Sequence, residues 1–412
     1  QMNGVDDYLH QAADPTLRPA GITYEPDHSA TVSPLTTSLG VHEHWNNATN
    51  KQYTRNLGTG NGIELVYPAI WSGLTGTDWN NAANWWTGVV PSAATDVIIT
   101  TFSANQPVIS GSSATCHHLT LLSGTSLTII PGGALTVTGN LNNSGTLTIE
   151  SGGVSSSGSL IVNGISTGNV TYNRVMPAGS AWHYIASPVI LNSAPAASFY
   201  AWDETTGDWN SSATGIPGIG RGYTLQTTGN SVSFYGSISG EVNELSTTSP
   251  YSDCDWLGGE SNEYSTRSFV AGRNTNYGGG GWNLLGNPYT SALDVSKFID
   301  YNNGDNASAG DGSFDPNYEA VYLYDGSSFS YIGIQIPGYP NTSNSFGSNN
   351  VQVGQGFFVL SHCNMSTFSF SPGTSGMQTH NTSVELKSAG VPWPGLALKV
   401  KSGSVEKSTT VV

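Results

Sequence analysis

The stretch HLTLLSGTSLTIIPGGALTVTGNLNNSGTLTIESGG, residues 118–153, repeats one short pattern, and SLIVNG (159–164) repeats it again. Each unit alternates apolar and polar residues and ends in Gly, Pro or Asn. A strand this short cannot bury its own apolar face, so the units must stack on one another. The pattern predicts a short parallel β-helix or β-roll, with an antiparallel meander as the alternative because the spacing also suits hairpins. The leading leucines are Leu119, Leu127, Leu135, Leu147 and Leu160.

The composition of the 412-residue chain agrees with an all-β fold. Charged residues make up only 10%, whereas 51 Gly, 19 Tyr and 11 Trp are present. Disordered chains have few aromatic and many charged residues, so this composition favours a folded chain. Gly and Asn supply the positive φ angles that tight turns between short strands require.

The net charge of −16 limits the classes of partner. Such a surface repels phosphate backbones, which bind through Lys and Arg, so nucleic acid and anionic membranes are poor candidates as partners, and we expect no nucleic-acid binding. No apolar run reaches the length of a membrane span, so we expect no membrane insertion. Sugars and divalent cations remain as ligand classes.

A second, longer repeat occupies the following region and predicts a β-sandwich built from two related halves. Three segments recur in the same order. A propeller is less favoured because two units do not close a ring. The matching pairs are WHYIASPV (182–189) with WNLLGNPY (282–289), FYAWDETTGDW (199–209) with VYLYDGSSFSY (321–331), and GRGYTLQ (220–226) with GQGFFVL (354–360).

The sequence therefore divides into four predicted parts. Residues 1–68 form a short irregular N-terminal segment, the tail of an upstream domain, and 69–164 combine a small Trp-rich segment with the β-helix or β-roll. Residues 165–380 hold the duplicated-unit sandwich, and 381–412 start a further β module that is cut short. We expect the chain to be a fragment or a processed product of a longer protein. Four tryptophans can anchor the Trp-rich segment, namely Trp71, Trp79, Trp85 and Trp86.

From Trp71 to Phe370 the ordered motifs resemble modules of large exported Bacteroidota proteins that use the type IX secretion system. These motifs are the Trp-rich segment with DVII, the LTI/LTV repeat, SLIVNGISTGNVTYNRVMPAGSAWHYIASPV, GWNLLGNPYTSALD and VGQGFFVL. The N-terminal stretch LGVHEHWNNATNKQYTRNLGTGNGIEL resembles the tail of another group of exported bacterial proteins. The resemblance implies an extracellular or cell-surface location.

An acidic loop at 301–319 is the candidate calcium site. Asp305, Asp311 and Asp315 lie there among Asn side chains and backbone carbonyls. Hard oxygen ligands at this density suit Ca²⁺, although the spacing is not that of an EF-hand. Calcium is the one cofactor that the sequence predicts, and a solvated, turn-rich loop is the alternative.

Aromatic residues at matching places in the two halves form a candidate sugar platform. They are Trp202, Trp209, Tyr324 and Tyr331. Exposed rings with polar neighbours can bind a sugar, whereas aromatic residues repeated at equivalent places also suit a core.

Histidines and cysteines give weaker signals. His42 and His44 flank Glu43 and would face the same way on a strand, so both could bind one metal ion, but no third ligand is evident. Placed on a strand, His117 and His118 would point to opposite faces, which predicts a poor chelate.

The three cysteines are assigned separately. Cys116 is expected to be a buried free thiol. Cys254 and Cys363 could form a disulfide if the chain is exported. No spacing of cysteines and histidines predicts a zinc site.

The sequence contains no motif that predicts a catalytic centre: its glutamates are scattered and it has no G-x-S-x-G elbow. We therefore expect a non-catalytic extracellular scaffold or adhesion region. One alternative is a polysaccharide-binding accessory region of a secreted enzyme, and another is a subunit of an extracellular fibre or sheath. The expected partners are extracellular polysaccharide, matrix or other surface proteins, or further copies of this chain.

Overall fold

The computed structural model describes residues 68–380 with gaps, and the backbone of strands on either side. The gaps are 112, 153–155, 177–181, 211–216, 227–230, 241, 248–280, 304–312, 315–318, 325–328, 334–348, 362–366 and 372–375. The described strands outside this span lie at 23–24, 41–46, 51–56, 62–65, 396–402 and 405–411. Strands dominate the residues that the structure describes, so the all-β prediction is confirmed.

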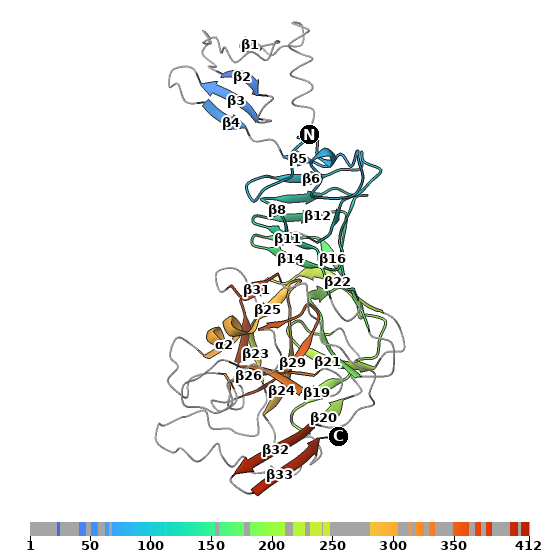
Figure 1. Ribbon diagram of the computed structural model, residues 1–412, viewed down its shortest axis with the longest axis vertical. Helices are drawn as coiled ribbons and strands as arrows, with labels where there is room; N and C mark the ends of the chain where they lie inside the picture. The colour runs from blue at the N-terminus through green and yellow to red at the C-terminus, as the bar shows by residue number, and fades with distance from the viewer. Residues whose placement is uncertain are drawn as a thin grey trace.

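The repeated leucine units form a β-solenoid of about three turns (Figure 1). Each of the three complete coils contributes one strand to each of three sheets, always in the same order, and the last, partial coil contributes β15 and β16 to the first two. The strands of successive coils pair in parallel, so the β-helix prediction is confirmed and the meander alternative is wrong. The first sheet contains β5 (Ala69–Ile70), β6 (Val97–Ile99), β9 (Leu119–Leu121), β12 (Leu141–Asn143) and β15 (Ser166–Thr167). The second contains β7 (Val108–Ile109), β10 (Ser126–Ile129), β13 (Thr146–Glu150) and β16 (Asn169–Val175), and the third contains β8 (Ser113–Cys116), β11 (Ala134–Val137) and β14 (Ser159–Val162).

The period-2 alternation of each unit separates a buried row from an outer row. Leu127 lies beside Leu147, and Leu147 lies beside Val170 on the next coil. All three side chains are buried, because they point into the solenoid. The threonines between the apolar positions point outward, as alternation in a strand requires. The leucine ladders are therefore what makes one coil pack on the next.

Three of the four predicted tryptophans close the N-terminal end of this core. Trp71 and Trp79 both contact Trp85 edge-on, with ring centroids 5.0 and 4.7 Å apart. The Trp85 indole also donates to the Trp79 carbonyl over 2.7 Å. The short 3₁₀ helix η2 (Ala82–Asn84) positions Trp85. Trp86 is 58% exposed and does not belong to the anchor.

The second sheet of the solenoid does not end with the last coil. Strand β16 pairs antiparallel with β22 (Ser231–Ile238), and β22 pairs with β18 (Val189–Leu191). The result is one six-stranded sheet that runs from the solenoid into the sandwich region, with β16 and β22 at the junction (Figure 1).

The two predicted halves of the sandwich region have the same strand pairing. Strands β17 (Trp182–Ala186) and β21 (Gly222–Gln226) pair in the first half, as β24 (Trp282–Gly286) and β29 (Gly356–Leu360) do in the second. The hairpin β19 (Ala201–Asp203) and β20 (Asp208–Asn210) matches the hairpin β26 (Ala320–Tyr324) and β27 (Phe329–Gly333). Similarly, β16 pairs with β22 as β23 (Val242–Ser246) pairs with β30 (Thr367–Phe370). The three sequence matches thus occupy equivalent strands.

The remaining elements complete the described chain. Strand β25 (Ala292–Asp294) lies between β28 (Asn350–Val351) and β31 (Gln378–Thr379), and helix α2 (Val295–Asn303) follows β25. Toward the N-terminus, β1 (Thr23–Tyr24), β2 (Val41–Asn46), β3 (Lys51–Asn56) and β4 (Gly62–Leu65) form a sheet. Toward the C-terminus, β32 (Leu396–Ser402) and β33 (Val405–Val411) form a hairpin.

Candidate functional site

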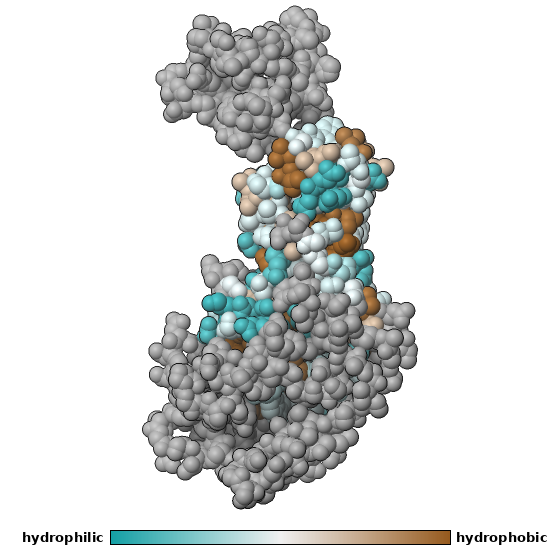
Figure 2. All heavy atoms as spheres, viewed as in Figure 1, coloured by the Kyte–Doolittle hydropathy of each residue, from teal (hydrophilic) through white to brown (hydrophobic). Residues whose placement is uncertain are grey.

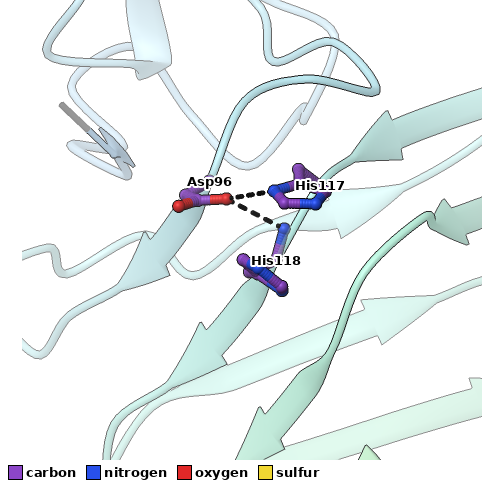
Figure 3. Close-up of side chains that lie close together, drawn as sticks. All are labelled: Asp96, His117 and His118. Carbon is purple, nitrogen blue, oxygen red and sulfur yellow. Dashed lines mark hydrogen bonds and ion pairs between the residues drawn. The ribbon is translucent and has the colours of Figure 1, made fainter. Parts of the chain in front are cut away.

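A cluster of possible metal ligands lies at one corner of the solenoid (Figure 3). Asp96 directly precedes β6, and His117 and His118 form the bend between β8 and β9. The ligand atoms of the three side chains lie within 4.8 Å of one another. Asp96 Oδ1 is 2.8 Å from His117 Nδ1, and these two side chains are 48% and 44% exposed. The cluster is therefore open to solvent.

The structure corrects the expectation that His117 and His118 point to opposite faces. Strand β8 ends at Cys116 and β9 begins at Leu119, so neither histidine is part of a strand. The backbone turns at the corner, and the two rings lie 3.9 Å apart between centroids. The alternation rule failed because it holds only within an extended strand.

The same corner recurs on successive coils as a ladder of side-chain acceptors. Asp96 Oδ1 accepts the backbone N–H of His118 over 3.2 Å, and His118 Nδ1 accepts that of Asn140 over 2.8 Å. Asn140 Oδ1 then accepts the N–H of Ile165 over 2.9 Å. Asp96, His118 and Asn140 are each 22 residues apart. This 22-residue spacing is the sequence signal for the coil period, and it was missed because the three residue types differ.

The ladder restricts the chemistry of the cluster. Because His118 Nδ1 accepts a hydrogen bond, the neutral ring carries its proton on Nε2, and Nε2 has no lone pair for a metal. Asp96 and His117 are thus the two ligands on offer, whereas structural zinc sites use four. A third ligand from His118 would require loss of its bond to Asn140. The three side chains are therefore better suited to stabilising the backbone at the corner of the coil than to binding a metal ion permanently.

The predicted sugar platform lies in an aromatic cluster that the two halves share. Trp202 and Trp209 pair across their hairpin, edge-on, with ring centroids 5.2 Å apart. The Trp202 indole donates to the carbonyl of Trp282 in the other half over 2.7 Å. Tyr324 is only 7% exposed and contacts Tyr184, whereas Trp202 and Trp209 are half-buried. Tyr331 lies on β27, and its side chain is outside the described residues.

Several other predicted sites fall outside the described residues. They are the calcium ligands Asp305, Asp311 and Asp315 and the cysteines Cys254 and Cys363. His42, Glu43 and His44 lie on β2, but their side chains are not described.

Cys116 and two histidines are the buried titratable groups that stand out in the described part of the chain. Cys116 is a free, fully buried thiol, as predicted, and burial raises its pKa to about 12. His380 lies between Thr136 Oγ1 and Ser159 Oγ, at 2.8 and 2.7 Å. Burial lowers the His380 pKa to about 4. Burial, aided by the positive charge of Arg174, also lowers the His183 pKa to about 4.

Comparison with known proteins gives a family but no described activity. A family model described as a domain of unknown function, DUF8693, matches residues 70–382. No curated protein and no solved structure matches the chain. In the part of the chain that the structure describes, no helix is long and apolar enough to cross a membrane.

Proposed function

This chain belongs to the DUF8693 family, and we propose that it is a non-catalytic, extracellular scaffold or adhesion region that acts as one rigid unit. Such a unit would hold neighbouring domains of a bacterial surface protein at a fixed separation. The observation that carries this proposal is the six-stranded sheet shared by the solenoid and the sandwich region.

Two buried donors support the rigidity of this shared sheet. Tyr172 and Arg174 lie on β16 and point inward. The Tyr172 hydroxyl and Arg174 Nη1 both donate to the carbonyl oxygen of Val353, over 3.1 and 2.9 Å. Val353 belongs to the second half of the sandwich region, so the last coil is tied to both halves.

A further set of bonds joins the third sheet of the solenoid to the second half. The Leu160 N–H donates to the Thr290 carbonyl, and the Thr290 hydroxyl donates to the Leu160 carbonyl, both over 2.8 Å. His380 bonds to Thr136 and Ser159 on the neighbouring strands β11 and β14. Bending at the junction would break bonds on both sides of the solenoid at once. This double attachment favours a scaffold over two modules joined by a hinge.

The surface chemistry supports an extracellular structural role. The chain has few charged residues, and Ser, Thr and Asn occupy many outer positions of the strands. In Figure 2, the visible surface of the solenoid is mostly pale, with separate hydrophilic and hydrophobic patches. Large continuous apolar patches promote association between proteins. Separate, small patches on a mostly polar surface do not, which suits a protein that stands among other surface molecules.

Rigidity can be tested by measuring distances between two spin labels in the full chain. Thr146 on the solenoid and Asp300 in α2 are both exposed and suit substitution by cysteine, with the native cysteines replaced by serine. We expect a single narrow distance distribution. The double variant Thr290→Val, His380→Ala removes the side-chain hydrogen bonds of the attachment at the third sheet, leaves the backbone bond from Leu160 to Thr290, and should broaden the distribution. A broad distribution of label-to-label distances in the chain that keeps Thr290 and His380 would overturn the proposal of one rigid unit.

The extracellular location is tested in cells that produce the native protein, and the lack of catalysis is tested with the purified chain. We expect a protease added to intact cells to degrade the protein. Full protection in intact cells, with degradation after lysis, would overturn the extracellular role. A measured hydrolytic rate of the purified chain on a polysaccharide or peptide would overturn the non-catalytic one.

A further inference from the structure

The outer face of the six-stranded sheet carries hydroxyl groups in straight rows. Thr128 lies beside Thr148, Thr148 lies beside Thr171, and Thr171 lies beside Tyr235, each on the next strand. Two positions earlier on the same strands, Ser126 lies beside Thr146. We call this surface the hydroxyl face, which comprises Ser126, Thr128, Thr146, Thr148, Thr171 and Tyr235.

The threonine hydroxyls at the centre of this face are available to a ligand, whereas the Tyr235 hydroxyl accepts a hydrogen bond from Asn169 Nδ2 over 3.1 Å. The side chains of Thr128, Thr148 and Thr171 make no hydrogen bond to any residue that the structure describes. They are half-buried, as expected in the middle of a sheet, while Thr146 is exposed and Tyr235 is 47% exposed. Each hydroxyl can donate one hydrogen bond and accept two.

The hydroxyl face is also uncharged. On the six strands of this sheet, Glu150 is the only carboxylate that points outward, and it lies at the end of β13 beside Asn173. Arg174, the one cation on these strands, points inward. A neutral polar face within a chain of net charge −16 disfavours both polyanions and polycations as specific ligands here.

The spacing of the rows indicates an extended, repeating ligand. Neighbouring strands are about 4.8 Å apart, and alternate residues along a strand are roughly 6.6 Å apart. A polysaccharide chain that runs across the strands presents one sugar, with several hydroxyls, at nearly every strand. Tyr235 ends the row with an exposed ring, the kind of apolar platform on which a sugar ring packs.

We propose that the hydroxyl face binds an extended, neutral polysaccharide that runs across the strands from Thr128 to Tyr235. A second protein sheet is a poorer fit, because packed sheet faces are apolar and the centre of this one is threonine. This site is separate from the Trp202 and Trp209 cluster, and it does not depend on the rigidity of the junction.

The test measures binding of the full chain to defined polymers. The neutral probes are microcrystalline cellulose, chitin, soluble β-1,3-glucan and mannan, and alginate is the polyanionic comparison. We expect depletion of the protein by at least one neutral polymer, unchanged between low and high salt, and none by alginate. Binding to none of the neutral polymers would overturn the proposal, and so would equal binding to alginate.

Variants locate the site. The triple variant T128V/T148V/T171V keeps β-branched side chains of similar size and removes three hydroxyls that can bond the ligand, so affinity should fall about tenfold or more. Thr120→Val is the matched control, since Thr120 is an outward, half-buried threonine on the first sheet of the solenoid. Tyr235→Ala provides a second variant at an exposed position, where folding is insensitive, and should also weaken binding.

The remaining outcomes are equally decisive. Unchanged affinity in both the triple variant and Tyr235→Ala would overturn the hydroxyl face as the site. Loss of affinity in Trp209→Ala, with none in those variants, would instead assign binding to the aromatic cluster. Affinity that falls as much in Thr120→Val as in the triple variant would also contradict the proposal.

Discussion

The backbone N–H of Gly286 donates a hydrogen bond to the carbonyl oxygen of Gly220 over 2.9 Å. The equivalent pair with the halves exchanged, Ala186 and Gly354, makes the same bond over 3.0 Å. Gly220 and Gly354 have φ angles of +73° and +70°, a conformation that glycine adopts without strain. Each half therefore supplies a left-handed glycine whose carbonyl oxygen accepts a backbone hydrogen bond from a strand of the other half.

Gly286→Ala should destabilise the protein, because this contact leaves no room for a side chain. A Cβ at Gly286 would overlap with the Cβ of Ala186 and lie 2.9 Å from the carbonyl oxygen of Arg221. We expect a loss of about 1–3 kcal/mol in the free energy of unfolding, measured by urea titration. Gly240→Ala, where no atom lies within 4 Å, is the control and should change little. Equal stability of the two variants would contradict the close contact.

Tyr172→Phe should loosen the junction between solenoid and sandwich. It removes the hydroxyl that donates to Val353, and leaves that carbonyl with one donor fewer. A loss of about 1 kcal/mol is expected, read from the shift in the thermal midpoint. The matched substitution Tyr235→Phe, on the solvent side of the same strand pair, should cost less than about 0.5 kcal/mol. A larger cost at Tyr235 than at Tyr172 would argue against this role of the buried hydroxyl.

Stability should fall as the pH drops from about 6.5 to about 4. His380 and His183 both have folded-state pKa values lowered to about 4 from the usual 6.5. Within this window the unfolded chain binds protons that the folded chain does not, so the free energy of unfolding is complete above pH 6.5 and decreases below it. For His380 the decrease is at most about 3 kcal/mol.

The variant His380→Gln tests this pH dependence. It cannot titrate and should flatten the dependence of the urea midpoint on pH between 7 and 4. A pH profile identical to that of the unmodified chain would show that His380 does not contribute.

At the solenoid corner, His118 should carry its proton on Nε2 and not on Nδ1, because Nδ1 accepts the Asn140 N–H. Nitrogen-15 NMR of the imidazole rings distinguishes the two tautomers directly. With only Asp96 and His117 free to ligate, zinc should raise the melting temperature little. A large increase with zinc that His117→Ala abolishes would show that the corner holds a metal ion after all.

Cys116 should resist alkylation in the folded protein at pH 8. The thiolate is the reactive form, and burial holds the pKa of this thiol near 12. Iodoacetamide followed by mass spectrometry should modify Cys116 only after denaturation. Modification at the same rate in both states would contradict its place inside the coil, beside Val137.

The solenoid was predictable because its determinants are local. Each strand unit shows the alternation that separates buried Leu127 and Leu147 from the outward threonines, and nothing distant is needed to place them. The duplicated halves were predictable for a related reason, since matching motifs fold into matching strands.

What the sequence did not reveal depends on contacts between distant segments. The junction pairs β16 with β22, about 60 residues later, and no local pattern marks that partnership. The corner cluster was misjudged because His117 and His118 were placed on a strand, whereas the coil turns there. The rows of the hydroxyl face arise only when coils stack in register.

The exchange of glycine turns between the halves bears on how this architecture arose. A single copy of the repeated unit would satisfy the same contacts only by pairing with a second molecule, in a symmetric dimer. Fusing two copies in tandem makes that encounter intramolecular and fixes the partner at high effective concentration. The sequence differences between the halves then mark their specialisation. The first copy pairs with the second sheet of the solenoid through β16 and β22, and the second copy bonds to its third sheet at Leu160.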